Sequence, residues 1–302
     1  MPDSVALGKL LTEQPNPSTE GIDALDTVSA LHLISGEDSK VVPAVRAEIP
    51  NIARAVEAVV QALRQGGRLF YIGAGTSGRL GVLDASECPP TFNAPPGMVQ
   101  GIIAGGEAAL SRASEASEDD PGAGRHDLLA RGFCSKDVLL GIAASGRTPY
   151  VLGAVEAARQ LAAVTIGLSF TPESALARAV DIAITPLTGP EIIAGSTRMK
   201  AGTATKLVLN MISTVAMIRL GFVYGNLMVN VQPKSVKLRD RARRIVARAL
   251  SLDPAAAAAL LDRAGGNVRA AIVMGRLGLD LPAAEERLKQ AGGRVSEALR
   301  HG

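Results

Sequence analysis

Short apolar runs alternate with segments of helical hydrophobic spacing along most of the chain. Five runs indicate buried strands, at residues 68–72, 98–104, 138–144, 163–168 and 182–185. Apolar residues recur at helical intervals over residues 24–35, 41–65, 80–85, 151–161 and 207–220. Strands that alternate with helices are joined by right-handed crossovers. The pattern therefore predicts an α/β fold, a doubly wound parallel sheet with helices on both faces.

The two ends of the chain follow different patterns. Residues up to about Asp23 are rich in Thr, Glu, Asn and Pro, which predicts an extended arm. From Lys234 a basic stretch opens a region of short helical segments that glycines separate. We expect an arm and helix at 1–40, a ligand-binding α/β domain at 41–233, and a small helical C-terminal module at 234–302.

Composition and charge narrow the class of protein. The chain has 302 residues, of which 47% are hydrophobic and only 3% aromatic, so small aliphatic side chains must build the core, as in buried parallel sheets. The net charge of +3 favours neither nucleic acid nor a membrane surface as a partner. The N-terminus lacks the features of a secretory signal, and no apolar run reaches the roughly 18 residues that span a bilayer. These features predict a soluble cytoplasmic protein.

Metal ligands are not suggested by the sequence. Cys88 and Cys134 match no metal-binding spacing, and we expect buried, reduced thiols rather than a disulfide. His32, His126 and His301 are scattered outside every motif. We therefore expect no metal.

The first predicted strand leads into a glycine-rich loop, Gly73-Ala74-Gly75-Thr76-Ser77-Gly78, which precedes a helix. Such a turn directs free backbone N–H groups at a bound anion, and its hydroxyls add donors. The loop lacks the GK[ST] ending of a nucleotide P-loop, and its glycine spacing does not fit a dinucleotide fingerprint. A single loop of this kind could also be an ordinary tight turn.

A second loop repeats this design. GIAASGRT, at residues 141–148, follows another predicted strand and offers Ser145 and Thr148 as donors. Loops at the carboxyl ends of parallel strands lie at one edge of the sheet, where ligands bind. The two loops together predict a phosphate site made by Gly75, Thr76, Ser77, Ser145, Gly146 and Thr148.

The pair strand-GxGTSG and strand-(A/S)SGxT resembles the sugar isomerase (SIS) domain, a doubly wound α/β fold that binds phosphosugars. Longer segments, at residues 73–92, 141–151 and 189–211, resemble N-acetylmuramic acid 6-phosphate etherases. Residues 12–23 resemble the arm of that family, although Gln14-Pro15 departs from its usual basic residues. The resemblance runs over nearly the whole chain.

The resemblance implies an enzyme, a carbon–oxygen lyase of cell-wall amino-sugar recycling. Such an enzyme eliminates D-lactate from C3 of the phosphorylated amino sugar and then adds water, which gives N-acetylglucosamine 6-phosphate. It also implies a homodimer, to which the helix at 207–220 would contribute. Two alternatives on the same fold are a phosphosugar isomerase and a non-catalytic phosphosugar sensor that resembles glucokinase regulatory protein.

The implied reaction needs a base for the C2 proton and an acid for the departing ether oxygen, which two carboxylates can supply. The resemblance therefore implies that no metal and no organic cofactor is required. The resemblance places the acid on Glu87, in LDASECPP, and the base on Glu118, in SEASEDD. A pure sensor would need no acid at position 87. Asp84 remains an alternative to Glu87, and Glu118 competes with the neighbouring acidic residues Glu115, Asp119 and Asp120.

Basic residues beside these motifs leave further alternatives open. Arg79 and Arg147 each follow a loop glycine and could bind phosphate or the lactyl carboxylate, or else pair with Asp84 or Glu87. The polar residues 196–200 could cap the next helix or line the site. Lys237 resembles a phosphate-contacting lysine of related SIS proteins, although its basic stretch could equally be a solvated helix face.

Overall fold

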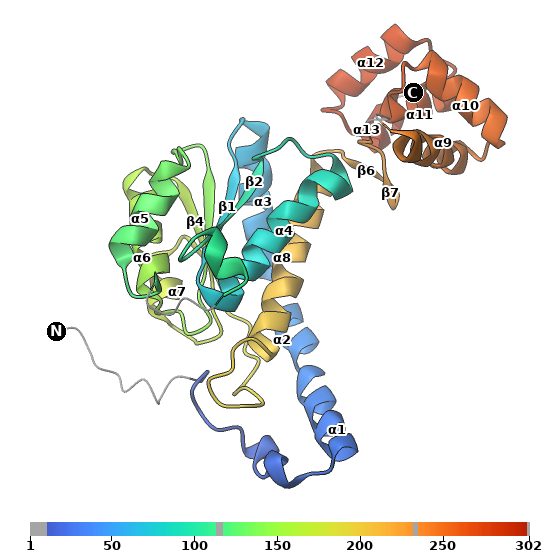
Figure 1. Ribbon diagram of the computed structural model, residues 1–302. Coiled ribbons are helices and arrows are strands. Elements are labelled where there is room, and N and C mark those ends of the chain that lie inside the picture. The colour runs from blue at the N-terminus through green and yellow to red at the C-terminus, as the bar shows by residue number, and fades with distance from the viewer. Residues whose placement is uncertain (1–10, 113–116, 232–234, 301–302) are drawn as a thin grey trace. The chain divides into compact units, whose positions relative to one another are not determined.

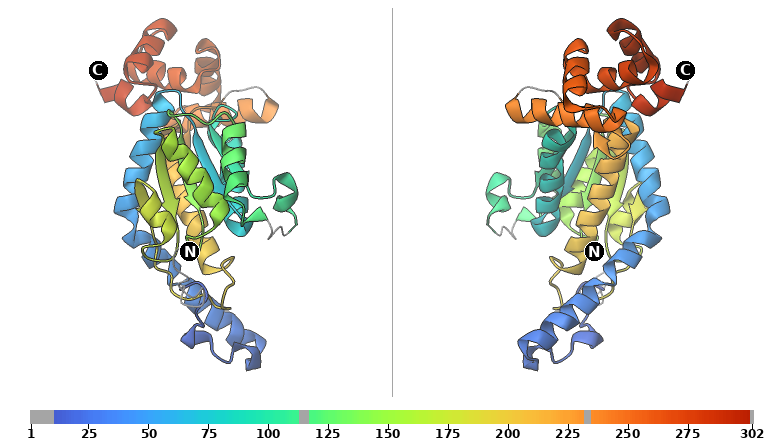
Figure 2. Two further views of the ribbon diagram at one scale, coloured as in Figure 1. Left: turned by 90° about the vertical axis from the view of Figure 1, so that its left-hand side faces the viewer. Right: turned by 90° about the vertical axis from the view of Figure 1, so that its right-hand side faces the viewer.

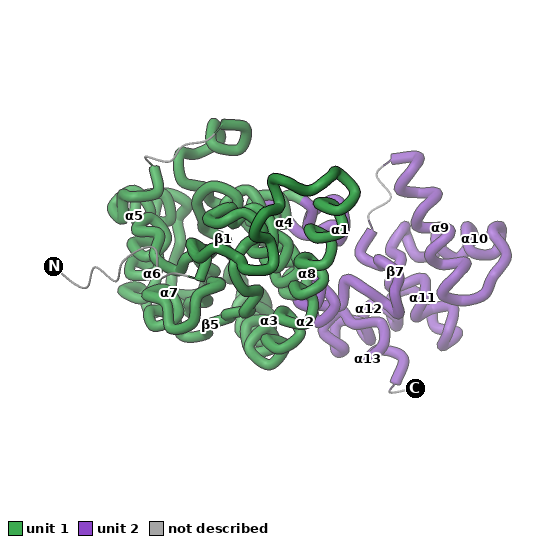
Figure 3. Tube along the Cα trace, turned by 90° about the horizontal axis from the view of Figure 1, so that it is seen from below, with its two compact units in different colours: residues 1–86, 97–213 green, residues 87–96, 214–302 purple. Residues whose placement is uncertain are grey.

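The computed structural model describes residues 11–112, 117–231 and 235–300. The chain divides into two compact units, shown in Figure 3: unit 1 comprises Met1–Ser86 and Gly97–Ser213, and unit 2 comprises Glu87–Pro96 and Thr214–Gly302. The predicted division at residues 41 and 234 stays a prediction, since compactness alone does not define a folding domain.

Unit 1 contains a five-stranded parallel sheet in the order β2-β1-β3-β4-β5 (Figure 1). Its strands are β1 (Leu69–Gly73), β2 (Val99–Ile103), β3 (Val138–Ile142), β4 (Val164–Leu168) and β5 (Ile182–Ile184). The predicted doubly wound α/β fold is thus confirmed. The strand order reverses between β1 and β3, and in such sheets the crevice outside the carboxyl ends at this point holds ligands.

Helices cover both faces of the sheet, which Figure 2 views from two opposite sides. One layer contains α3 (Ile49–Arg64), α4 (Gly75–Phe92) and α8 (Lys200–Arg219); the other contains α5 (Pro121–Ala130), α6 (Pro149–Gln160) and α7 (Ala175–Ala179). Successive strand residues point to opposite faces. Phe70 and Ile72 accordingly belong to the core beneath α6, while the Tyr71 hydroxyl donates to Asp84 of α4 at 2.9 Å.

Several helices differ in extent from their predictions. The predicted helix at 41–65 is two helices, α2 (Val41–Ala47) and α3, because Pro50 lacks an N–H and fits only the first turn of a new helix. The helix predicted at 80–85 is the long α4, which begins at Gly75. The N-terminal helix α1 (Thr27–Asp38) is capped by Asp26, whose carboxylate accepts from the N–H groups of Val28 and Ser29.

The N-terminal arm is fixed to the fold by a buried ion pair. Lys200 Nζ lies 2.8 Å from Glu37 Oε2, and both side chains are almost fully buried. Asn16 donates to the same oxygen at 2.9 Å and to the carbonyl oxygen of Pro190 at 3.2 Å. The described part of the predicted extended arm contains short 3₁₀ turns at Pro17–Thr19 and Ile22–Ala24.

Two expectations from composition concern membrane-spanning segments and the two cysteines. Helix α8 is long and apolar enough to cross a membrane by length and composition alone, but 56% of its apolar window is buried inside the protein. A core helix of a soluble protein passes the same test, so this finding is weak evidence for a membrane span. Neither Cys88 nor Cys134 is part of a disulfide; Cys88 is buried as expected, whereas Cys134 is exposed, so the expectation of two buried thiols is wrong.

Unit 2 builds its own core from short helices. It holds a two-stranded hairpin, β6 (Val223–Tyr224) and β7 (Leu227–Met228), followed by α9 (Val236–Leu250), α10 (Pro254–Arg263), α11 (Val268–Leu277), α12 (Leu281–Gln290) and α13 (Val295–Arg300). The central helix, α11, is almost wholly buried over residues 270–274. The side chains of Asp253, Asn267 and Asp280 cap α10, α11 and α12, respectively. These caps fix the residue at which each helix begins.

Candidate active site

A pocket of about 210 Å³ lies in unit 1 at the carboxyl ends of β1 and β3. Its floor is made by residues 74–77, which follow β1, by residues 142–145, which end β3 and begin the next loop, and by Thr148. Its walls are made by Glu118 and by two further pairs of residues, Thr12 with Glu13 and Gly195 with Thr197. The pocket therefore occupies the switch point of the sheet.

Three glycines of the first loop are required for two physical reasons, close backbone approach and a positive φ. A Cβ on Gly73 would lie 2.8 Å from the Gly78 nitrogen, and a Cβ on Gly78 would lie 2.6 Å from the Gly73 carbonyl oxygen, so strand and helix can approach only without side chains. Gly75 has a φ of +53°, which other residues rarely adopt. Helix α4 begins at Gly75, so first-turn N–H groups and the hydroxyls of Thr76 and Ser77 border the pocket.

The second loop is shaped in a similar way. Gly146 has a φ of +67°, and a Cβ there would lie 2.2 Å from Ser174 Oγ, so this glycine shapes the turn. Ser145 and Thr148 line the pocket, and Thr148 precedes α6 without capping it through its side chain. Gly146 is not among the lining residues, and its predicted contact with the substrate stays a prediction.

Glu118 is half-buried and lines the pocket. A Cβ placed on Gly75 would lie 3.5 Å from Glu118 Oε1, so the carboxylate lies against the backbone of the first loop. The Glu118 carbonyl oxygen accepts from the Tyr150 N–H at 3.0 Å, which fixes the segment to the start of α6. The structure thus brings Glu118 together with Thr76, Ser77, Ser145 and Thr148, all from distant parts of the sequence.

The acidic neighbours of Glu118 have other places. Asp120 caps α5 and accepts from the N–H groups of Gly122 and Ala123. Asp119 is exposed and is not among the lining residues. Glu115 lies outside the described residues. Of the described candidates in this acidic run, Glu118 alone lines the pocket.

Glu87 lies in the C-terminal part of α4. Its side chain is exposed, and along α4 it follows the pocket-lining Gly75 by about three helical turns. Glu87 belongs to unit 2 and is not among the residues that line the pocket. Its alternative, Asp84, is buried and accepts from Asn210 at 2.6 Å and Ser213 at 3.1 Å as well as from Tyr71, which is a structural arrangement. The catalytic role of Glu87 stays a prediction.

Two further predictions concern basic residues. Lys237 is exposed in the first turn of α9 in unit 2, and its predicted contact with phosphate stays a prediction. The guanidinium of Arg79 donates to the carbonyl oxygens of Ala109, Leu110 and Arg112. Arg79 therefore holds the loop after β2 in place, instead of pairing with a carboxylate as one alternative proposed.

Sequence reasoning did not single out the wall formed by the arm. The Gly195 N–H donates to the Thr12 carbonyl oxygen at 3.0 Å, and a Cβ on Gly195 would lie 3.1 Å from Glu13 Oε2. Glu13 is thus a second carboxylate at the pocket. The resemblance of residues 12–23 to a family arm and the polar cluster at 196–200 were the two signals that pointed to this wall.

The ion pair between Lys200 and Glu37 favours the ionised form of Glu37. Burial acts against ionisation of Glu37, but hydrogen bonds from Lys200, Lys40 and Asn16 outweigh it and lower the pKa of Glu37 to about 2. Glu191 accepts from the N–H groups of Lys200 and Ala201 and so caps α8. The predicted polar cluster at 196–200 therefore splits, since Thr197 lines the pocket while Lys200 anchors the arm.

The sequence of the chain is similar to those of known proteins. The model of the glucokinase regulatory protein N-terminal SIS domain matches residues 51–159. An N-acetylmuramic acid 6-phosphate etherase from Edwardsiella ictaluri is 54% identical to the chain, over 90% of this chain and 90% of that protein. An N-acetylmuramic acid 6-phosphate etherase from Gloeobacter violaceus is 56% identical, over 88% of this chain and 87% of that protein.

A solved structure agrees at the level of the fold. A putative phosphosugar isomerase involved in capsule formation from Bacteroides fragilis superposes with a TM-score of 0.50 at 18% identity. The likeness covers 67% of this chain and 95% of that one, and it concerns the fold alone. Among the described residues, no group of three His, Cys, Asp or Glu side chains could hold a metal ion. By its identity to the two relatives over most of both lengths, the chain belongs to the family of N-acetylmuramic acid 6-phosphate etherases.

Proposed function

We propose that this enzyme cleaves the D-lactyl ether of N-acetylmuramic acid 6-phosphate with Glu118 as base and Glu87 as acid. The single observation that carries the proposal is the position of Glu118. Its carboxylate lies against Gly75 of the first loop, inside a pocket whose floor is hydroxyl-rich and glycine-rich. A base must lie within reach of a bound sugar, and this carboxylate meets that requirement.

The floor of the pocket binds the phosphate group. Two helices, α4 and α6, begin at its edge, and helix N-termini favour anions because their first N–H groups lack intrahelical partners. Thr76, Ser77, Ser145 and Thr148 supply hydroxyl donors beside them. This arrangement holds the phosphate by backbone and neutral groups, which suits a doubly charged ligand that must also leave after the reaction.

The reaction proceeds in two balanced steps. Glu118 removes the proton from C2 of the open-chain sugar, the electrons form a C2–C3 double bond, and the C3–O bond breaks as Glu87 gives its proton to the departing lactate oxygen. Water then adds to C3, its proton goes to the carboxylate that has become the base, and C2 regains a proton from the other. The products are N-acetylglucosamine 6-phosphate and D-lactate.

We also propose that the enzyme acts as a homodimer in the cytoplasm. Met211, Val215 and Ile218 are exposed at helical spacing on α8, which forms an apolar stripe suited to a second copy. A phosphorylated sugar carries charge that keeps it inside the cell, so its enzyme belongs in the same compartment. Sedimentation of wild type and of Ile218→Glu tests the dimer; an unchanged dimer in the variant contradicts the role of this stripe.

The reaction is tested in water enriched in heavy oxygen. The enzyme is incubated with N-acetylmuramic acid 6-phosphate, and we expect free D-lactate together with label at C3 of the amino sugar. Substrate binding without lactate release contradicts the etherase function. Exchange of the C2 hydrogen with solvent, without cleavage, would instead indicate a phosphosugar isomerase.

The role of Glu87 is tested by Glu87→Gln. We expect lactate release to fall by about a hundredfold, within the usual range for a lost general acid, while C2 hydrogen exchange persists. Glu285→Gln, an exposed glutamate also in unit 2, is the matched control and should keep full activity. If exchange is lost in Glu87→Gln and retained in Glu118→Gln, the two roles are reversed.

A further inference from the structure

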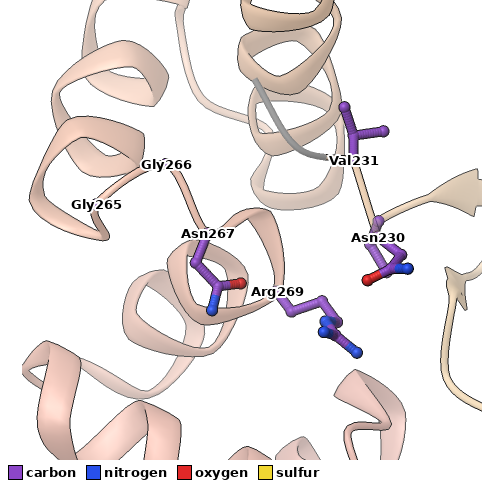
Figure 4. Close-up of a pocket in the computed structure, with 7 residues that line it drawn as sticks. Asn230, Val231, Gly265, Gly266, Asn267 and Arg269 are labelled. Atoms are coloured by element: carbon purple, nitrogen blue, oxygen red, sulfur yellow. The ribbon is translucent and has the colours of Figure 1, made fainter. Parts of the chain in front are cut away.

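Unit 2 contains a pocket of its own, of about 270 Å³. Val229, Asn230 and Val231, which follow the hairpin, form one side of it; the turn of Gly265, Gly266 and Asn267 between α10 and α11 forms the other. Arg269, in the first turn of α11, also lines the pocket, and Figure 4 shows its side chain extending toward the segment that carries Asn230. The etherase reaction as described above makes no use of these residues.

Arg269 is a half-buried cation that no carboxylate of the described chain pairs with. Its hydrogen bond there is a long one, 3.5 Å from Nη1 to the Gly293 carbonyl oxygen. Burial lowers the pKa of Arg269, yet a guanidinium stays protonated in proteins. Partial burial of a charge without a counterion carries a desolvation cost, which an anion in the pocket would offset.

The amide of Asn267 supplies a second donor at the pocket. Its oxygen accepts from the Ala270 N–H at 3.2 Å and so caps α11; within the described chain its NH₂ group has no hydrogen-bond partner and can donate to a ligand. Asn230 is fixed in place by donating to the carbonyl oxygens of Phe92 at 3.0 Å and Asn93 at 3.3 Å. The pocket thus has defined walls, and its side-chain donors are the Arg269 guanidinium and the Asn267 NH₂ group.

The charge of unit 2 favours the same kind of ligand. Residues 87–96 and 214–302 contain 15 Lys or Arg and 8 Asp or Glu, a formal charge of +7. The whole chain carries +3, so unit 1 carries −4. Positive potential raises the local concentration of anions.

We propose that the pocket at Arg269 binds a phosphate group, free or esterified to a small molecule, as a second anion site separate from the loops of unit 1. The planar guanidinium matches two oxygens of a phosphate at once, and the Asn267 NH₂ group can reach a third. A phosphate monoester suits an enzyme whose substrate and product both carry one. The proposal does not depend on which glutamate performs the cleavage.

The test is a titration of the full-length chain, labelled with ²H and ¹⁵N, with inorganic phosphate at constant ionic strength. We expect saturable shifts of the backbone amide signals of Gly265, Gly266 and Asn267. Signals of Thr76 and Ser77 report the loops of unit 1 separately. Arg269→Gln should weaken binding at the unit 2 signals by about tenfold or more, which corresponds to about 1.4 kcal/mol, and leave the unit 1 signals unchanged.

Two further variants serve as controls for the loss of charge and for the loss of folding. Arg263→Gln removes the same charge from an exposed position that does not line the pocket, and it should bind phosphate as wild type does. Asn267→Asp keeps a good N-cap for α11 but places a carboxylate at the pocket, so it should fold normally and lose the unit 2 shifts. Equal shifts in wild type and Arg269→Gln, or no shifts at millimolar phosphate, overturn the proposal.

The chemical class of ligand is tested by separate titrations with N-acetylglucosamine 6-phosphate and D-lactate. The phosphate ester should produce the same pattern of shifts as inorganic phosphate. Shifts with D-lactate in the absence of shifts with phosphate would show a carboxylate site and overturn the assignment to phosphate.

Discussion

The floor and the walls of the unit 1 pocket are built in different ways. The floor consists of two loops whose shape is set within a few residues, by glycines at positive φ and by close contacts such as that between Gly73 and Gly78. The walls consist of Glu118, the arm residues Thr12 and Glu13, and Gly195 with Thr197, which long-range contacts hold in place. The proposed phosphate site is thus encoded locally, whereas the position of Glu118, the proposed base, depends on the packing of distant elements.

This difference predicts where substitutions act. Changes in the floor should weaken binding of the substrate and leave the fold intact. Changes in the walls, or in the contacts that hold them, should impair the chemical step or the stability of the fold. Four predictions, from the largest expected effect to the smallest, test that division.

The largest effect is expected for the wall residue Glu118. Glu118→Gln should lower kcat about a thousandfold, the loss typical of a removed general base, with little change in KM. Asp119→Asn, one residue away and exposed, is the control and should retain activity. Steady-state lactate release measures both; a loss confined to KM would show that Glu118 binds substrate instead of acting as the base.

The next effect concerns the ion pair that anchors the arm. Glu37→Gln leaves the buried Lys200 without its anion, so the free energy of unfolding at neutral pH should fall by about 3 kcal/mol. Because the folded pKa of Glu37 is about 2, against a reference value of 4.5, ionised Glu37 stabilises the fold above pH 4.5. That contribution is lost as the pH falls toward 2.

Urea unfolding of wild type and Glu37→Gln at several pH values measures this effect. The difference between the two proteins should shrink as the pH falls from 4.5 to 2. Asp38→Asn, the next residue along α1, serves as the control and should keep the wild-type dependence. A difference that stays constant with pH would contradict the role assigned to the charge of Glu37.

A smaller effect is expected where α5 and α6 touch. A Cβ on Gly153 would lie 2.0 Å from the Pro121 carbonyl oxygen, so Gly153→Ala must move the backbone three residues from Glu118. We expect a loss of about 2 kcal/mol in stability and a lower kcat with KM little changed. Gly36→Ala, on an exposed face of α1 with open space around it, should instead be neutral or stabilising.

The smallest effect is expected in the floor. Ser145→Ala removes one hydroxyl donor and should raise KM about tenfold, the contribution of a hydrogen bond to a charged group. Its stability should match wild type within experimental error. Ser86→Ala, an exposed serine on α4, is the control and should change neither quantity. A drop in stability as large as that of Gly153→Ala would erase the distinction between floor and walls.

Much of unit 1 could be predicted because its signals are local. Apolar runs of strand length gave the five strands, and the two glycine-rich loops indicated the edge where the pocket lies. The helix limits were less accurate, since the break before Pro50 and the start of α4 at Gly75 depend on neighbouring turns. Sequence spacing also could not separate Glu118 from its acidic neighbours, which only their contacts distinguish.

By itself, the sequence determined the parallel sheet, the two loops and, through resemblance, the family, since hydrophobic periodicity and loop chemistry act over a few residues. The tertiary structure decided that Glu118 lies against Gly75, that Asp84 is bound in the core, and that Glu13 borders the pocket. It also showed Arg269 at a pocket without a carboxylate beside it in the described chain. These facts depend on which distant side chains pack together, because burial and hydrogen-bond partners are properties of the folded chain.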